Sequence, residues 1–219
     1  MKKLAFTLAE VLVTLGIIGV VAAMTMPTLV SNHQKKVYVT QLKKVYTELT
    51  QALSRYKNDN NAINIMEAGN MTTANCSEKF LQKYFNVAGT CTTCFDYDAK
   101  TINGTAIEIP DPNTTTGVIL PSGAVIKMIV NGKVASELYA VFYIDTNGQK
   151  GPNTFGRDLF ILASDIDGKV DDPSFLAGKR YSQPGTDENV IREQTSKDCF
   201  TSNGGCFSKI LMDSWEMKY

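Results

Sequence analysis

The sequence has a single histidine among its 219 residues and lacks the short motifs that usually carry catalysis. It contains no Gly-x-Ser-x-Gly turn, no glycine-rich phosphate loop and no histidine-rich metal motif. An enzyme made from this chain would have to use scattered carboxylates or serines. We therefore expect a protein that is not an enzyme.

An excess of either charge is also missing. Lysine and arginine together number 22, aspartate and glutamate also number 22, and the formal net charge is zero. Binding to nucleic acid needs a basic excess or stripe, so we expect no nucleic-acid partner. The sequence has no internal repeat, and its 43% hydrophobic and 20% charged residues are ordinary for a folded domain.

Charge is absent altogether from the twenty residues between Val11 and Val30. A helix rises about 1.5 Å per residue, so this stretch matches the roughly 30 Å hydrocarbon core of a bilayer. We therefore predict one membrane span, at about residues 11–30. Two lysines precede the stretch and two follow it, so the positive-inside rule orients the span only weakly.

Glu10 stands just before this uncharged stretch, inside an apolar run that begins at Phe6. A carboxylate costs about 2.5 to 3.5 kcal/mol at the centre of a membrane and less near its surface. A simple membrane anchor has no use for such a residue. One interpretation is that Glu10 lies shallow enough to reach the lipid headgroups, and its sequence neighbours indicate another.

Those neighbours are a short basic leader, residues 1–5 with Lys2 and Lys3, followed by Phe6, Thr7, Leu8, Ala9 and Glu10. This arrangement resembles the processing site of type IV prepilins and of type II secretion pseudopilins. The resemblance covers residues 1 to about 56. It departs from the family at Ala5, where glycine is commoner, and at Ala9, where a larger aliphatic residue is usual.

The resemblance implies that a prepilin peptidase cleaves between Ala5 and Phe6 and that the new amino group of Phe6 is methylated. It also implies that Glu10 and Thr7 take part in subunit assembly. Further matches within the span are Gly16 and Gly19, where such helices loosen, and Pro27, where many of them kink.

Cleavage before Phe6 would leave a cationic amine in an apolar assembly, and a buried charge is tolerable only when it is paired. Glu10 lies one helical turn away and could neutralise the amine of its own chain or that of an adjacent subunit. The resemblance favours the adjacent subunit. Glu10 would then set the axial register of assembly, as one buried polar group does in a coiled coil.

A secretory signal peptide is the main alternative to this interpretation. Lys2 and Lys3 would form its basic region, and the sequence Val21, Ala22, Ala23 offers a small-residue cleavage site. Glu10 would interrupt the apolar region of such a peptide, however, and the run continues to Val30. It is therefore longer than the roughly 7 to 15 residues that are usual in signal peptides.

The five cysteines favour disulfides because the chain carries an export signal. Cys199 and Cys206 flank a turn-rich hexapeptide that can bring their sulfurs together, so we predict a bond between them. A second bond should join two of the three residues Cys76, Cys91 and Cys94, which leaves one cysteine unpaired. Cys91 and Cys94 form a C-x-x-C motif, but without a second such motif it does not predict a zinc site.

The helix should continue beyond the membrane, because apolar residues recur there at spacings of three and four. These residues are Tyr38, Leu42, Val45, Leu49, Leu53 and Tyr56. We therefore expect a leader at 1–5, an N-terminal helix at 6–57 and an extracytoplasmic globular domain at 58–219.

Within the globular domain we predict a short helix at 77–84 and strands at 118–120, 124–130, 138–145 and 157–163. Asn131 and Gly132 suggest a hairpin turn. The strand at 138–145 is apolar on both faces, so it should be central, with one face on the helix and the other under a loop. Ile210, Leu211, Met212 and Trp215 should return to the sheet. The fold class is α+β, a long N-terminal helix packed on an antiparallel sheet, which is the architecture of pilins.

The loop after the strand at 138–145 is rich in glycine and in oxygen-bearing side chains. Calcium prefers six to eight oxygen ligands, so Asp145, Asn147 and Asp158 with backbone carbonyls suggest a calcium site. The simpler alternative is a turn held by hydrogen bonds from Asp145 and Asn147. Apart from calcium, the sequence suggests no cofactor.

These observations predict a structural pilin-like subunit, either a pseudopilin or a minor pilin. It would sit in a bacterial inner membrane with its C-terminal domain outside the cytoplasm. Its partners would be copies of itself or other pilin-like subunits, the prepilin peptidase and an inner-membrane assembly platform. The motif does not choose between a secretion pseudopilus, a type IV pilus and a DNA-uptake system. The alternative is a membrane-anchored binding domain for calcium or glycan that does not polymerise.

Overall fold

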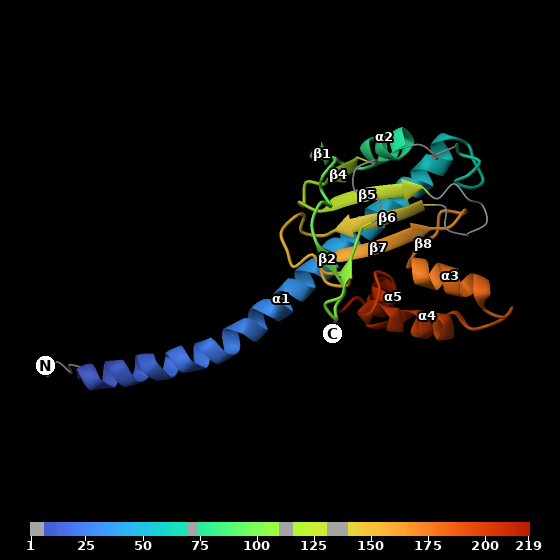
Figure 1. Ribbon diagram of the computed structural model, residues 1–219. Helices are drawn as coiled ribbons and strands as arrows, with labels where there is room; N and C mark the ends of the chain where they lie inside the picture. The colour runs from blue at the N-terminus through green and yellow to red at the C-terminus, as the bar shows by residue number, and fades with distance from the viewer. Residues whose placement is uncertain (1–6, 70–73, 110–115, 131–139) are drawn as a thin grey trace, which may run out of the picture. The chain divides into compact units, whose positions relative to one another are not determined.

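The computed structural model describes residues 7–69, 74–109, 116–130 and 140–219 (Figure 1). The chain divides into two compact units, Met1–Val37 and Tyr38–Tyr219. The helices are α1 (Leu8–Asp59), α2 (Ala74–Tyr84), α3 (Pro173–Tyr181), α4 (Glu188–Ser196), a 3-10 helix η1 (Lys197–Phe200) and α5 (Cys206–Met212). The strands are β1 (Gly89–Cys91), β2 (Ala99–Lys100), β3 (Ala106–Ile107), β4 (Gly117–Ile119), β5 (Val125–Val130), β6 (Ala140–Asp145), β7 (Leu159–Ser164) and β8 (Val170–Asp171).

The helix α1 is 52 residues long, and its first half is apolar. By length and composition it can cross a membrane, and none of its most apolar window is buried. The large apolar side chains from Leu8 to Val30 are exposed, which in water would be unfavourable over so large an area. The chain therefore has one N-terminal apolar helix of membrane length, as predicted.

From Tyr38 onward, α1 buries one face in the core of the second unit. The buried residues of α1 are Val39, Leu42, Val45, Leu49, Ala52 and Leu53. Four of the six predicted stripe residues are thus fully buried, and the other two, Tyr38 and Tyr56, pack against the same core while partly exposed. The 3.6-residue period places these side chains on one side of the helix.

The main sheet has six strands in the order β1-β4-β5-β6-β7-β8, and every neighbouring pair is antiparallel. The predicted strands at 118–120, 124–130, 138–145 and 157–163 correspond to β4, β5, β6 and β7, with shifts of one or two residues at their ends. The predicted turn at Asn131 and Gly132, together with residues 138–139, lies outside the described residues. The predicted helix at 77–84 is contained in α2. The fold class is α+β, as predicted.

The strand β6 is central and apolar on both faces. Phe142 and Ile144 lie in the same core as the buried residues of α1. Tyr143 faces the other way and packs with Phe95, Ala99 and neighbouring residues of the segment 91–109, which carries the two-stranded β2-β3 sheet. We call this segment the excursion. Beside it, Val141 also contacts a third cluster, where Phe175 and Leu176 of α3 meet Ile191 of α4. The second face of β6 is therefore covered by the excursion and two helices rather than by a loop alone.

The C-terminal part of the chain is helical, and these helices were not predicted from the sequence. Ile210 of α5 is buried in the main core, and Leu211 and Trp215 pack against it. Met212 is 47% exposed, so the prediction that it returns to the sheet was wrong. The helix α5 is held to α1 by Phe207, whose ring centroid lies 5.3 Å from that of Tyr46.

Two disulfides cross-link the second unit, and both are typical of a domain outside the cytoplasm. Cys199 is joined to Cys206, the pair expected from the intervening loop, with a Cα to Cα distance of 4.3 Å. Cys91 is joined to Cys94, one of the pairings left open. Each bond packs against a glycine, since an added Cβ would lie 2.4 Å from the Cys206 sulfur at Gly156 and 2.8 Å from the Cys94 sulfur at Gly117.

Candidate functional site

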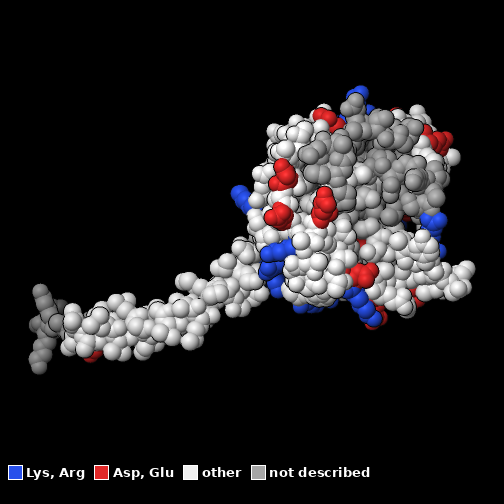
Figure 2. All heavy atoms as spheres, viewed as in Figure 1, with Lys and Arg blue, Asp and Glu red and all other residues white. Residues whose placement is uncertain are grey.

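The sequence points to two regions, the start of α1 and the loop between β6 and β7. In the first region, Ala5 and Phe6 lie outside the described residues, so their cleavage and methylation remain predictions. Thr7 and Glu10 are described, and both are exposed. Figure 2 shows that the apolar half of α1 carries almost no charge, while charges of both signs are spread over the second unit.

Thr7 and Glu10 form a reciprocal capping arrangement at the start of α1. The backbone N–H and the hydroxyl of Thr7 both donate to Oε2 of Glu10, each at 2.8 Å. In return the backbone N–H of Glu10 donates to the Thr7 hydroxyl oxygen at 3.3 Å. This is a capping box, which satisfies backbone donors that a helix N-terminus otherwise leaves without partners.

The capping box gives Glu10 a defined position in the apolar half of the helix. It is the only charged residue between Thr7 and Gln34 when His33 is neutral. Both hydrogen bonds from Thr7 end on Oε2, and Oε1 accepts none from the described residues. One oxygen is therefore available to a cation while the other keeps its bonds.

Gly16, Gly19 and Pro27 all lie inside α1, which is helical through each of them. An added Cβ at Gly16 or Gly19 would meet no atom within 4 Å. Among the described residues, therefore, nothing covers these two positions of α1. The loosening and kink suggested for these three residues remain predictions.

In the second region, Asp145 ends β6 and is fully buried. The hydroxyl of Tyr97 donates to its Oδ2 at 2.6 Å, and the backbone N–H of Asn147 donates to its Oδ1 at 3.1 Å. Burial, and to a smaller extent the nearby carboxylate of Asp158, raises the pKa of Asp145 to about 7, although the hydrogen bonds from Tyr97 and Asn147 act to lower it. Burial also raises the pKa of Tyr97 well above its usual range, so Tyr97 stays a hydrogen-bond donor.

Asp158, at the far end of the loop, is also fully buried. Its two carboxylate oxygens accept from the backbone N–H groups of Asn153 at 2.9 Å and Thr154 at 2.8 Å. The side-chain amide of Asn147 donates to the carbonyl oxygen of Lys150. Burial raises the pKa of Asp158, and these N–H donors oppose that rise.

The structure thus brings Asp145, Asn147 and Asp158 into one loop, as the calcium hypothesis requires. Their hydrogen bonds are those of the simpler alternative, a turn organised by aspartate and asparagine side chains. Within residues 7–69, 74–109, 116–130 and 140–219, no group of three His, Cys, Asp or Glu side chains is arranged to hold a metal ion. The side-chain oxygens of Asn147 and Asn153 are buried and accept no hydrogen bond from the part of the chain that the structure describes. The hydrogen bonds of the loop can form without calcium, and calcium binding remains a prediction.

Tyr97 is the residue of this region that the sequence did not reveal. It belongs to the excursion, and 48 positions separate it from Asp145. Gln149 and Phe155 of the loop also bond to the excursion, at the carbonyl oxygens of Thr93 and Lys100. A lone tyrosine in a polar segment carries no signal of such a contact. The loop therefore serves to fasten the excursion to the sheet.

We expect the stability of the second unit to depend on the charge of Asp145. Its folded pKa is higher than the usual 3.8, so the folded state binds a proton that the unfolded state has already lost. The free energy of unfolding should then fall as pH rises from about 4 to about 7 and level off above that. The rise to about 7 corresponds to at most roughly 4 kcal/mol.

Urea unfolding of the full chain in detergent micelles, measured across this pH range, tests that expectation. The Asp145→Asn variant keeps one acceptor oxygen and cannot ionise, so its stability relative to the native chain should improve as pH rises. Asp167→Asn is the control, because Asp167 is exposed and its side chain makes none of the described hydrogen bonds. Parallel pH curves for the native chain and Asp145→Asn would show that Asp145 ionises normally in the fold.

Comparison of the chain with protein-family models, with curated proteins and with solved structures finds no match. The resemblance to known architectures therefore rests on the helices and strands of the chain itself. A long N-terminal apolar helix leads into a domain whose antiparallel sheet packs on the continuation of that helix. The architecture is pilin-like.

Proposed function

We propose that this chain is a structural subunit that polymerises through the apolar half of α1. The observation that carries the proposal is the exposed apolar half of α1, from Leu8 to Val30. Its only charge, Glu10, is held in a capping box, and one carboxylate oxygen accepts no hydrogen bond from the described residues. Such a helix can bury its surface in a bilayer or against copies of itself. The capping box supplies an anion at a fixed depth, which a plain anchor does not need.

In this proposal a prepilin peptidase removes residues 1–5 and Phe6 becomes the methylated N-terminus. The subunit waits in a bacterial inner membrane with the disulfide-linked unit on the extracytoplasmic side. An assembly platform in that membrane then adds it to a filament of identical or related subunits. The filament is a type II secretion pseudopilus or a type IV pilus-like fibre, and the role of the chain in it is structural rather than enzymatic.

In the same proposal, Glu10 pairs with the Phe6 amine of a neighbour, and the contacts of Glu10 support this pairing. Before assembly, the bonds from Thr7 lower the cost of holding a carboxylate near apolar surroundings. After assembly, Oε1 can receive the ammonium group of an adjacent subunit while Oε2 keeps its bonds. The pair then fixes how far one helix is displaced along the next.

The mature N-terminus tests this proposal most directly. We expect mass spectrometry of the membrane-bound protein to find a chain that begins with N-methylated Phe6. Cells that lack the prepilin peptidase provide the control and should yield a chain that begins at Met1. A mature chain that begins at Met1 when the peptidase is present, or that begins after Ala23, would reject the pilin assignment.

A further inference from the structure

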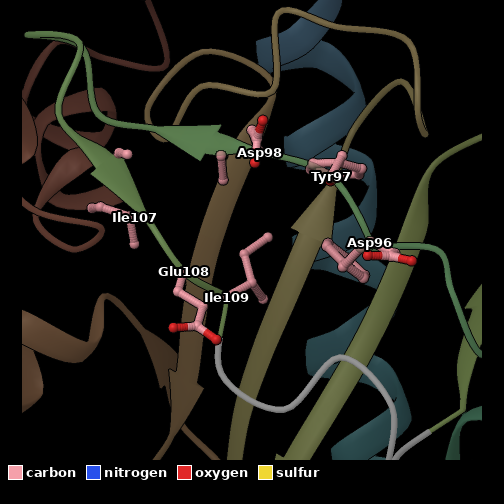
Figure 3. A pocket seen from close by; sticks show the side chains of 9 residues that line it. Asp96, Tyr97, Asp98, Ile107, Glu108 and Ile109 are labelled. Atoms are coloured by element: carbon pink, nitrogen blue, oxygen red, sulfur yellow. The ribbon is translucent and has the colours of Figure 1, made fainter.

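The excursion encloses a hollow that the proposed function does not use (Figure 3). It lies between two legs of the chain on either side of the β2-β3 pair, residues 95–99 and 106–109. Phe95 and Ile109 form its floor and are almost fully buried, and the partly exposed side chains of Tyr97 and Ile107 supply its accessible apolar surface. The carboxylates of Asp98 and Glu108 come from opposite legs, and Asp96 adds a third.

The rim of this hollow is acidic. Asp96, Asp98 and Glu108 are exposed, and none forms an ion pair with a described residue. Lys100 is the only basic residue among positions 95–109. An apolar lining under an acidic rim fits a side chain with an apolar stem and a cationic head, which lysine provides.

The chain carries such side chains in one segment of α1. Residues 31–47 include four lysines and no acidic residue. Lys43 lies over the Trp215 ring, at 5.2 Å from its centroid. Lys44 extends outward with 60% of its side chain exposed, and its distance of 3.9 Å to Glu48 is that of a weak surface pair.

We propose that the acidic hollow of one subunit receives the Lys44 region of a second copy. The two surfaces differ from each other, so the contact is heterologous. Repeated from copy to copy, a heterologous contact forms a ring if its rotation closes and an open filament if it does not, and the proposed function corresponds to the filament. Opposite charges on the two surfaces select this pairing and oppose others. The inference rests on the proposed function, because it needs copies held side by side.

Charge reversal tests the contact in cells that assemble filaments from the full chain. Asp98→Lys should lower filament yield by about tenfold or more, since two like charges would meet at each contact. Lys44→Glu should do the same for the same reason. The double variant, Asp98→Lys with Lys44→Glu, restores opposite charges and should recover most of the yield. Glu193→Lys on α4 is the matched control and should assemble normally, because Glu193 is exposed and far from the hollow in sequence.

Cysteine cross-linking provides a second measurement. In a Cys76→Ser background, one copy carries Asp98→Cys and another, differently tagged, carries Lys44→Cys. Disulfide-linked dimers that contain both tags should form only when the two copies are made together. Normal filaments with Asp98→Lys and no mixed dimers would overturn the inference and leave the proposed function standing. Absence of filaments from the native chain would reject the proposed function itself.

Discussion

The Glu10→Val variant should be made, processed and retained in the membrane, but should not enter filaments. Valine removes the only charge from the apolar part of α1, so insertion into a bilayer becomes easier. In the proposed filament the same change leaves the Phe6 amine of a neighbour without its anion. Removing one partner of a buried ion pair costs roughly 3 to 5 kcal/mol, and here the cost recurs at every subunit contact.

Two further variants separate charge from shape and from helix capping. Glu10→Gln keeps an acceptor for the Thr7 N–H but has no charge, so it should restore filaments poorly. Thr7→Ala removes the hydroxyl and keeps the carboxylate, and loss of a helix cap costs about 1 kcal/mol. We therefore expect Thr7→Ala to weaken assembly without abolishing it.

Electron microscopy and cross-linking of cells that express each variant give the readout. If Thr7→Ala failed as completely as Glu10→Val, the capping box rather than the charge of Glu10 would be the essential feature. Normal filaments from Glu10→Val would mean that Glu10 only reaches the lipid headgroups. The same cells should be checked for the mature N-terminus, so that a processing defect is not mistaken for an assembly defect.

The parts of the fold that follow a simple periodicity were predictable from sequence. The spacing of Leu42, Val45, Leu49 and Leu53 places them on one face of α1, and all four are buried. The continuous apolar run in β6 likewise predicts a strand buried on both faces, as observed. In both cases the pattern repeats often enough within one element to outweigh local propensities.

The C-terminal helices were missed although their start signals are present in the sequence. Asp172 followed by Pro173 is a typical helix start, with an N-cap aspartate and proline in the first turn. Asp187 caps α4 in the same way. Each helix has only nine residues and few apolar positions, so periodicity gives little evidence for it. These helices are stabilised mainly by packing, for example by Phe175 against Arg192, whose guanidinium carbon lies 3.7 Å from the ring centroid.

The contacts of the candidate sites also differ in how far the sequence predicts them. The capping box joins residues three positions apart, and a threonine followed by glutamate at that spacing predicts it. The bond from Tyr97 to Asp145 and the hollow within the excursion depend on long-range folding. No local pattern in the sequence encodes such contacts.

The Asp172→Ala variant should lose much of the stability of the second unit. Asp172 is fully buried and joins the starts of two helices. Its Oδ1 accepts from the backbone N–H groups of Ser174 in α3, at 2.9 Å, and Gly205, at 3.0 Å. Its Oδ2 accepts from the N–H of Ser208 in α5, at 3.1 Å. Alanine would leave all three donors without this acceptor, at about 1 to 3 kcal/mol for each one that stays buried.

Gly205 and Ser208 are buried, so these two donors give an expected loss of roughly 2 to 6 kcal/mol, a large share of the 5 to 15 kcal/mol that is typical of folded domains. Urea unfolding of the full chain in detergent micelles measures it, and the near-ultraviolet signal of Trp215 reports on the packing of α5 against α1. Asp172→Asn keeps Oδ1, so its stability should lie between that of Asp172→Ala and that of the native chain.

Asp187→Ala is the matched control, since Asp187 is exposed and caps α4 through a single bond, to the Asn189 N–H at 2.9 Å. It should cost only about 1 kcal/mol. Equal losses for Asp172→Ala and Asp187→Ala would mean that Asp172 acts as an ordinary helix cap and does not hold α5 in place.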